Sequence, residues 1–244
     1  MEEPGSVQAL AAYLYVLGLD DLAMAWEYLR RNPDYHHDWA KRDERALARW
    51  MLNAFEDPGL DARTAHPLWA IDPPLQLVPV PDDPEAPRLD LWKCGCDWHL
   101  THDGRLLRAT VLAATPTVRL ALCPRLGDGE CYAYRLPAGG GASAARRAAL
   151  DTAALHEQPA CPAAVRPARR AVLVSMHTLA VMDALACGAS ERDMGVLLFG
   201  CGRVAAEWSA ESALRAQVRH LVKRGRQFVA GGYRKLLGTG DLRR

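Results

Sequence analysis

The stretch SERDMGVLLFGCGRVAAEWSAESALRAQVRHLVKRGRQFVA, residues 190–230, decides the fold of the C-terminal part of the chain. Ser190 and Asp193 stand in the S-x-x-D pattern of a capping box, which predicts that a short helix begins after Ser190. Gly200 is expected to end this helix, and Gly202 lies in the turn that follows. Residues 204–208 are expected to form one helical turn, before a long helix that runs to about Ala230.

The long helix, which begins near Ser209 or Ser212, divides into two faces. At ~100° per residue, the apolar positions of one face fall within an arc of roughly 80°: Leu214, Val218, Leu221, Gly225 and Phe228. Four cations fall within a neighbouring arc of similar width: Arg215, Arg219, Lys223 and Arg226. A capped short helix, a glycine turn and a second helix divided in this way are what contact with the DNA major groove requires. The guanidinium fork of arginine suits both phosphate and the O6/N7 edge of guanine.

A cationic helix face can also be a plain solvated surface, and that alternative stays open from the pattern alone. Solvated faces usually alternate both signs, so that opposite charges pair at i,i+4. Here acids are nearly absent between Ala213 and Leu237, and like charges stand at i,i+4. A polyanionic partner would offset this repulsion.

The charge of the whole chain is unevenly distributed, although the net charge is only +1. Residues 1–100 carry 18 acidic and 9 basic side chains, a balance of −9, whereas residues 203–244 carry 10 basic and 3 acidic ones, a balance of +7. The basic end is therefore the expected contact for a polyanion. The acidic end is expected to stay off DNA and to serve self-association or a partner in transcription.

The first sixty residues predict helices. An apolar stripe from Leu10 to Leu17 is followed by a helix from about Asp20 to Arg31, with acids in its first turn and arginines in its last. Asn32 and Pro33 form an N-cap with proline at the first helical position, and the third helix is expected to run through Trp39 to Trp50.

The middle of the chain predicts extended structure. Residues 71–88 hold six prolines and are expected to form a connector. Short β-type runs follow at 105–113, 117–123 and 131–136, with turn signals at 102–104 and 127–129, which indicates an antiparallel meander of three or four strands. Residues 142–157 have high helix propensity. A second proline-bearing stretch, 159–167, precedes an apolar helix at 168–186 that ends at Gly188.

We therefore expect an α+β protein in four parts: an acidic helical region at residues 1–70, a Pro-rich connector at 71–88, an antiparallel β region at 89–141 and a helical, helix-turn-helix-like domain at 142–244. The N-terminus lacks a secretory signal, and no apolar run is long enough to span a membrane, so a cytoplasmic location is expected. The seven cysteines form no regular framework and are expected to be reduced.

Several strings of the sequence resemble one known family. Residues 188–200, 204–208, 219–222 and 231–237 are similar to the DNA-binding domain of the RovC-type transcription factors. Residues 25–35, through Trp39, resemble the transcriptional regulator-like segment at the front of such proteins. The resemblance implies a sequence-specific DNA-binding activator that can assemble as a hexamer. The family includes an activator of type VI secretion genes and regulators encoded on proteobacterial integrative conjugative elements.

The resulting hypothesis is a cytoplasmic, homo-oligomeric transcriptional regulator that binds double-stranded promoter DNA, with RNA polymerase or another regulator as a further partner. Four further cations are candidates for phosphate contacts: Arg203, Arg224, Arg234 and Lys235. No cofactor is implied and no enzymatic activity is expected. The alternative is an antagonist or scaffold that binds another regulator without touching DNA, since related element-encoded proteins include antagonists of activators.

Other candidate sites carry weaker signals. Cys94 and Cys96 stand in a C-x-C pattern that does not match the spacing of structural zinc sites. His36 and His37 are expected on a helix surface. Ser175, His177 and Asp183 contain the residue types of a nucleophilic triad but lie on one apolar helix without a nucleophile elbow, and His177 is expected to be a core histidine.

Overall fold

The computed structural model describes residues 10–71, 75–81, 85–90, 98–111, 118–136, 153 and 170–238. The chain forms two compact units. The helical unit comprises Met1–Ala46, Phe55–Pro67 and Pro167–Arg244, and the sheet unit comprises Leu47–Ala54 and Leu68–Arg166. The helices at the two ends of the sequence therefore belong to one unit, and the sheet unit is inserted between them along the chain.

The N-terminal helices begin where the sequence places their caps. A short 3₁₀ helix, η1 (Leu14–Gly18), precedes α2 (Asp21–Leu29), whose N-cap Asp20 accepts a hydrogen bond from the backbone N–H of Ala23. Helix α3 (Pro33–Lys41) begins after Asn32, whose side chain accepts from two backbone N–H groups. Because Arg42 adopts the left-handed conformation, with φ of 54°, α3 ends there and does not continue to Trp50 as expected. A 3₁₀ turn, η2 (Glu44–Ala46), follows.

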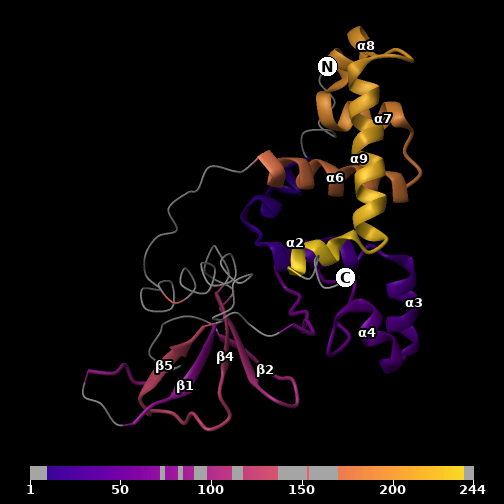
Figure 1. The fold of residues 1–244 in the computed structure, drawn as a ribbon. Coiled ribbons are helices and arrows are strands. Elements are labelled where there is room, and N and C mark those ends of the chain that lie inside the picture. Colours follow the sequence, from indigo (N-terminus) through magenta and orange to yellow (C-terminus); the bar gives the residue numbers. More distant parts are fainter. Residues whose placement is uncertain are drawn as a thin grey trace, which may run out of the picture. The chain divides into compact units, whose positions relative to one another are not determined.

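Five elements make up the C-terminal part of the helical unit: α6 (Arg170–Ala186), α7 (Glu191–Phe199), α8 (Cys201–Glu207), α9 (Ala213–Val229) and the 3₁₀ helix η4 (Gly232–Leu237). The expected capping box is present, because Ser190 and Asp193 bond each other's backbone N–H groups. Ser212 caps α9. The expected single turn at 204–208 is a seven-residue helix, α8. In Figure 1, α9 (yellow-orange) crosses α6, with α7 beside it and α8 toward its N-terminal end.

The described part of the sheet unit contains the short helix α4 (Leu47–Trp50) and five strands: β1 (Gln76–Pro79), β2 (Trp98–His102), β3 (Leu107–Val111), β4 (Val118–Leu122) and β5 (Tyr132–Arg135). The strand order is β2-β3-β4-β1-β5. Strands β2, β3 and β4 form an antiparallel meander, as expected for the runs at 105–113 and 117–123. The run at 131–136, which was expected to continue this meander, forms β5 and pairs with β1 instead. The Pro-rich segment is extended, as expected, but it also supplies β1, which lies between β4 and β5 and pairs parallel with β4.

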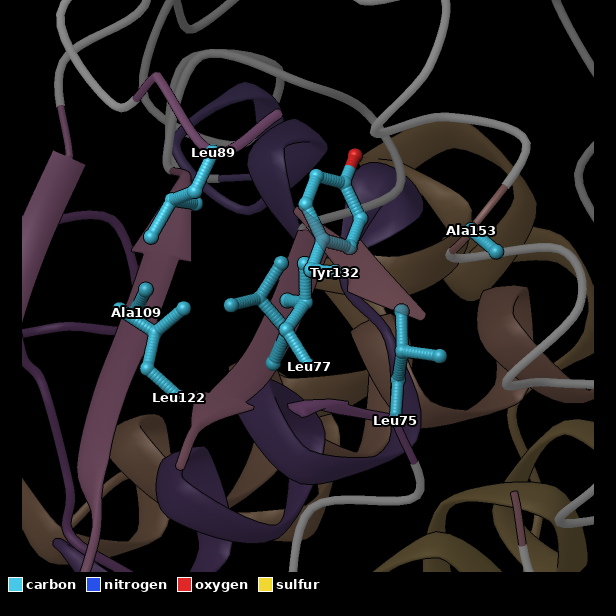
Figure 2. Packing of buried hydrophobic residues seen from close by; sticks show 8 residues of the cluster. Leu75, Leu77, Leu89, Ala109, Leu122, Tyr132 and Ala153 are labelled. Carbon is cyan, nitrogen blue, oxygen red and sulfur yellow. The ribbon is translucent and has the colours of Figure 1, made fainter. Parts of the chain in front are cut away.

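The sheet packs one face against its own apolar core. Leu75 and Leu77, from the segment expected to be a connector, are fully buried there. Figure 2 shows them in one cluster with Leu122, Tyr132 and Ala153. Burial of these leucines explains why a proline-rich segment joins the sheet. The proline within β1, Pro79, is its last residue and so does not interrupt the centre of the strand.

The fold class is therefore α+β, as predicted. Within the described ranges, no helix is long and apolar enough to cross a membrane. The helix expected at 142–157, the glycines 139–141, the prolines of 159–167, and Cys94 and Cys96 lie outside the described residues, apart from Ala153.

Candidate nucleic-acid interface

Helix α9 is held by its apolar face, as its sequence pattern predicts. Leu214, Val218 and Leu221 are at most 3% exposed, and the last two pack with Val181 and Met194. Further along the helix, Gly225 permits a close crossing with α6. A Cβ atom at this position would lie 2.4 Å from Sδ of Met182 and 3.1 Å from Cγ2 of Thr178. This packing therefore determines which side of α9 points away from the core.

Four predicted contact residues lie along that outward side. Arg219, Lys223 and Arg226 are exposed, and Arg215 is half-buried beside α7. Their spacing of four, four and three residues places them on one side of the helix. The structure thus brings together the four cations that the helical pattern had grouped.

An acidic side chain from α7 joins this cationic row. The carboxylate of Glu191 accepts a hydrogen bond from Nε of Arg215 at 2.7 Å and another from Nε of Arg219 at 3.0 Å. The hydrogen bonds from Arg215 and then Arg219 hold the pKa of the Glu191 carboxyl below its ordinary value. Glu191 therefore stays ionised and offsets the repulsion between the two arginines.

A hollow opens beside this ion-paired group. Apolar, acidic, cationic and amide side chains line it: Leu185, Glu191, Met194, Arg219, Val222, Lys223, Arg226 and Gln227. They come from the end of α6, the start of α7 and the middle of α9. Guanidinium, ammonium and amide donors around one depression make a surface suited to an anionic or hydrogen-bonding ligand.

The other four predicted contact residues are not part of this row. Arg203 lies on α8 and pairs with Glu207 at 3.1 Å. Arg224 turns toward the interior, where its guanidinium lies 4.7 Å from the ring centroid of Phe228 and its Nε is buried. Arg234 and Lys235 lie on η4, which follows α9; Arg234 stacks on Tyr233, and Lys235 is exposed.

The N-terminal helices support the C-terminal end of α9. The Asn32 side chain, which caps α3, also donates from Nδ2 to the carbonyl of Val229 at 2.8 Å. The rings of Tyr28 and Phe228 lie 4.7 Å apart between centroids. The sequence assigned the acidic N-terminal helices and the cationic helix to separate regions of the chain, and in the structure α2 packs against α9 within one unit.

A second set of contacts joins α2 to α6 through charged groups. Arg31 bonds both carboxylate oxygens of Asp183, at 2.6 and 2.8 Å, and Tyr13 donates to the same carboxylate at 2.6 Å. Burial alone would raise the pKa of Asp183, but the hydrogen bonds and charge of Arg31 outweigh burial and lower it. Glu27, fully buried, accepts from Arg30 and Arg31. Asp183 is therefore part of a structural ion-pair network.

The rival sites gain no supporting geometry within the described residues. No three His, Cys, Asp or Glu side chains of the described ranges gather as metal ligands would. His177 is half-buried, and burial lowers its pKa. His36 and His37 are exposed on α3.

Sequence reasoning missed Glu191 and Asn32 as parts of the interface and its support. Glu191 stands 24 and 28 positions before its two arginines, beyond any helical spacing. Its place in the first turn of a capped helix is explained locally by the helix dipole, so no local signal indicated a second role. Asn32 was recognised only as an N-cap, and its bond to Val229 spans 197 positions.

Two family models match the chain. Residues 135–238 match the DNA-binding domain of the RovC transcription factor of type VI secretion systems, and residues 7–60 match the proteobacterial transcriptional regulator-like domain. The chain belongs to the RovC-type family of transcriptional regulators. Its matched domains indicate a DNA-binding transcription factor. A comparison with curated proteins gave no match.

The matches fall mainly on the helical unit. The RovC DNA-binding domain spans α6 to η4 and so contains all eight predicted contact residues. The regulator-like domain includes η1, which packs against α6, and α2, which packs against α9. In this RovC-type protein, therefore, η1, α2 and α3 of one matched domain and α6 to η4 of the other lie in one packed unit.

Proposed function

We propose that this RovC-type protein binds double-stranded promoter DNA through the outward face of α9 and activates transcription. The observation that carries the proposal is the row of Arg215, Arg219, Lys223 and Arg226, which stands on the face of α9 next to its buried apolar stripe. Arginine and lysine side chains on one face of a helix can contact both phosphates and guanine edges when the helix lies in a major groove.

The contacts divide into two kinds by their placement. Arg219, Lys223 and Arg226 are exposed around the hollow, where Gln227 adds an amide, and they are proposed to enter the groove. Arg203 and Lys235, near opposite ends of α9, are proposed to contact phosphates, which fix the orientation of a protein on DNA. We assign Arg224 a packing role against Phe228 in place of its earlier phosphate role.

The short helix α7, the glycine at position 200, α8 and α9 are proposed to act as a helix-turn-helix-like element. Gly200 has φ of +82°, a conformation that side chains rarely adopt, and it joins α7 to α8 without a longer loop. A groove-reading helix has to be held at a fixed angle to its neighbours. The buried contacts of α9 with α6 and α7 would supply that angle.

Activation, self-association and a contact with RNA polymerase or another regulator belong to the same proposal. They rest on the family membership and on the two matched domains. Promoter DNA of type VI secretion genes or of an integrative conjugative element is the proposed target. Light scattering on the purified protein measures the oligomeric state directly, and a hexamer is the expected result.

The direct test is a gel-shift titration on the DNA upstream of the gene, at two salt concentrations. Each phosphate contact contributes about −0.9 to the slope of log affinity against log salt concentration. The wild-type protein is expected to lose affinity steeply as salt rises. The double variant Arg219→Ala, Lys223→Ala removes two groove contacts and is therefore expected to bind the upstream DNA more weakly.

A matched control removes the same charge elsewhere in the helical unit. The double variant Lys41→Ala, Arg45→Ala changes two exposed cations on α3 and η2, and it is expected to bind DNA as the wild type does. Equal loss in both double variants would mean that net charge, and not the α9 face, determines binding. No binding to any DNA, together with recovery of another regulator in a pull-down, would favour the antagonist instead.

A further inference from the structure

Glu191 contacts its two arginines in a way that leaves their ends available. Both hydrogen bonds use Nε: Arg215 donates to one carboxylate oxygen and Arg219 to the other. Among the described residues, neither guanidinium donates a hydrogen bond from its terminal Nη atoms. A guanidinium has five N–H donors, so each arginine keeps four on its outer end.

The remaining donors have the geometry of a base-reading fork. Two parallel N–H bonds from the end of a guanidinium match the O6 and N7 acceptors of guanine. A free arginine on a helix surface samples many rotamers, and ordering it on binding lowers affinity by roughly two- to tenfold per side chain. A carboxylate bound to Nε removes much of that freedom before DNA arrives.

The position of Glu191 is suited to this role. It is the first residue of α7, so its backbone is fixed by the capping box of Ser190 and Asp193. Its side chain is 38% exposed, and those of Arg215 and Arg219 are 30% and 54% exposed. The group therefore lies at the surface, where a DNA edge can reach the arginine ends.

The same carboxylate also acts on phosphate. A negative charge between two arginines repels a phosphate that approaches them, whereas a guanine edge offers neutral acceptors and no net charge. Glu191 thus weakens the phosphate contacts, which any DNA sequence can make, and does not weaken the contacts with a guanine edge.

We propose that Glu191 is a positioning residue that presents Arg215 and Arg219 to guanine edges and so sets the specificity of DNA binding. This inference rests on the proposed function, because it requires that α9 faces the groove. It assigns sequence specificity to an acidic residue outside α9.

The experiment compares Glu191→Gln with the wild type on three probes. The wild-type protein first selects its preferred sequence from a random duplex pool. Affinities are then measured for the selected duplex, for a scrambled duplex, and for the selected duplex with a guanine analogue that lacks the N7 acceptor. The specificity ratio is the affinity for the selected duplex divided by that for the scrambled one.

Glu191→Gln is expected to lower the affinity for the selected duplex roughly tenfold, since two side chains lose their order. Its affinity for the scrambled duplex is expected to hold or rise, with a salt slope steeper by up to about one. The guanine analogue should weaken the wild type more than the variant. Glu211→Gln removes an equal charge from an exposed residue just before α9 and is expected to keep the wild-type ratio.

Glu191→Asp separates positioning from stability, because it keeps the charge at the start of α7 but shortens the side chain. It is expected to fold as the wild type does and still to lose specificity. The inference is overturned if either Glu191 variant keeps the wild-type ratio, or if Glu191→Gln and Glu211→Gln raise the affinity for every duplex alike. If the wild type selects no sequence at all, the result contradicts the proposed function itself and not only the role of Glu191.

Discussion

The bond between Asn32 and Val229 is expected to couple the N-terminal helices to the end of α9. Asn32 is 7% exposed, so water cannot easily replace its side chain. Its oxygen caps α3, and its amide donates to the Val229 carbonyl in the last turn of α9. Asn32→Ser keeps a good N-cap and removes only the donor, whereas Asn32→Ala removes both.

The magnitude follows from these two contacts. A buried carbonyl left without a donor costs about 1–3 kcal/mol. Loss of an N-cap adds ~1 kcal/mol. We therefore expect Asn32→Ser to destabilise the helical unit by about 2 kcal/mol and Asn32→Ala by about 3 kcal/mol. For a chain of this size, the first change lowers the melting temperature by roughly 4–8 °C.

The assay combines thermal unfolding with hydrogen exchange. Because the chain has two units, the melting curve alone need not follow a single transition. Hydrogen exchange assigns the effect: Asn32→Ser should lose protection in the last turn of α9, which carries Arg226, and keep it at the start of α3. Asn53→Ser, at an exposed asparagine of the sheet unit, is the control and should leave both helices protected.

The reasoning would be refuted by an Asn32→Ser protein that melts at the wild-type temperature with α9 protected. The cap alone would then account for the role of Asn32, and the helices of the regulator-like domain would not stabilise α9 through this bond.

Three other expectations follow from the packing and charges. Gly195→Val should destabilise the helical unit by about 2 kcal/mol in thermal unfolding, because a Cβ there would lie 2.4 Å from Cζ3 of Trp208. Asp183→Asn should be less stable than the wild type at neutral pH, because Arg31 lowers the folded-state pKa of Asp183. The stability that the ionised carboxylate contributes is full above the unfolded-state pKa of about 4 and is lost as the pH falls through the lowered folded-state pKa. The unfolding free energies of the variant and the wild type in urea should therefore converge in acid. Leu77→Ala should cost about 2–5 kcal/mol in urea unfolding, as a fully buried core side chain does, whereas a connector residue would change little.

Local signals were sufficient for the caps and faces of the helices. Ser190, Asp193 and Asn32 form the caps that were predicted from neighbouring residues. The apolar stripe of α9 is buried where its spacing placed it. These features depend on residues at most a few positions apart, so they can be predicted from a short stretch of sequence.

The sheet shows where local patterns are insufficient. The turns at 102–104 and 127–129 were recognisable because glycine adopts positive φ at Gly104 and Gly129. Strand β1 was not, because its partners β4 and β5 lie more than forty positions away and its flanking prolines indicate a connector. Burial of Leu75 and Leu77 makes this segment a strand of the sheet, and burial is a property of the assembled unit.

The row of cations on α9 shows the same division. The sequence by itself determined that Arg215, Arg219, Lys223 and Arg226 share one face, because a helix has a fixed angular period. Only the tertiary structure decided that Glu191 holds two of them by Nε, that Arg224 turns inward to Phe228, and that Asn32 holds the end of the helix. These contacts join residues that are distant in the chain, and packing of the apolar core is what brings them within bonding distance.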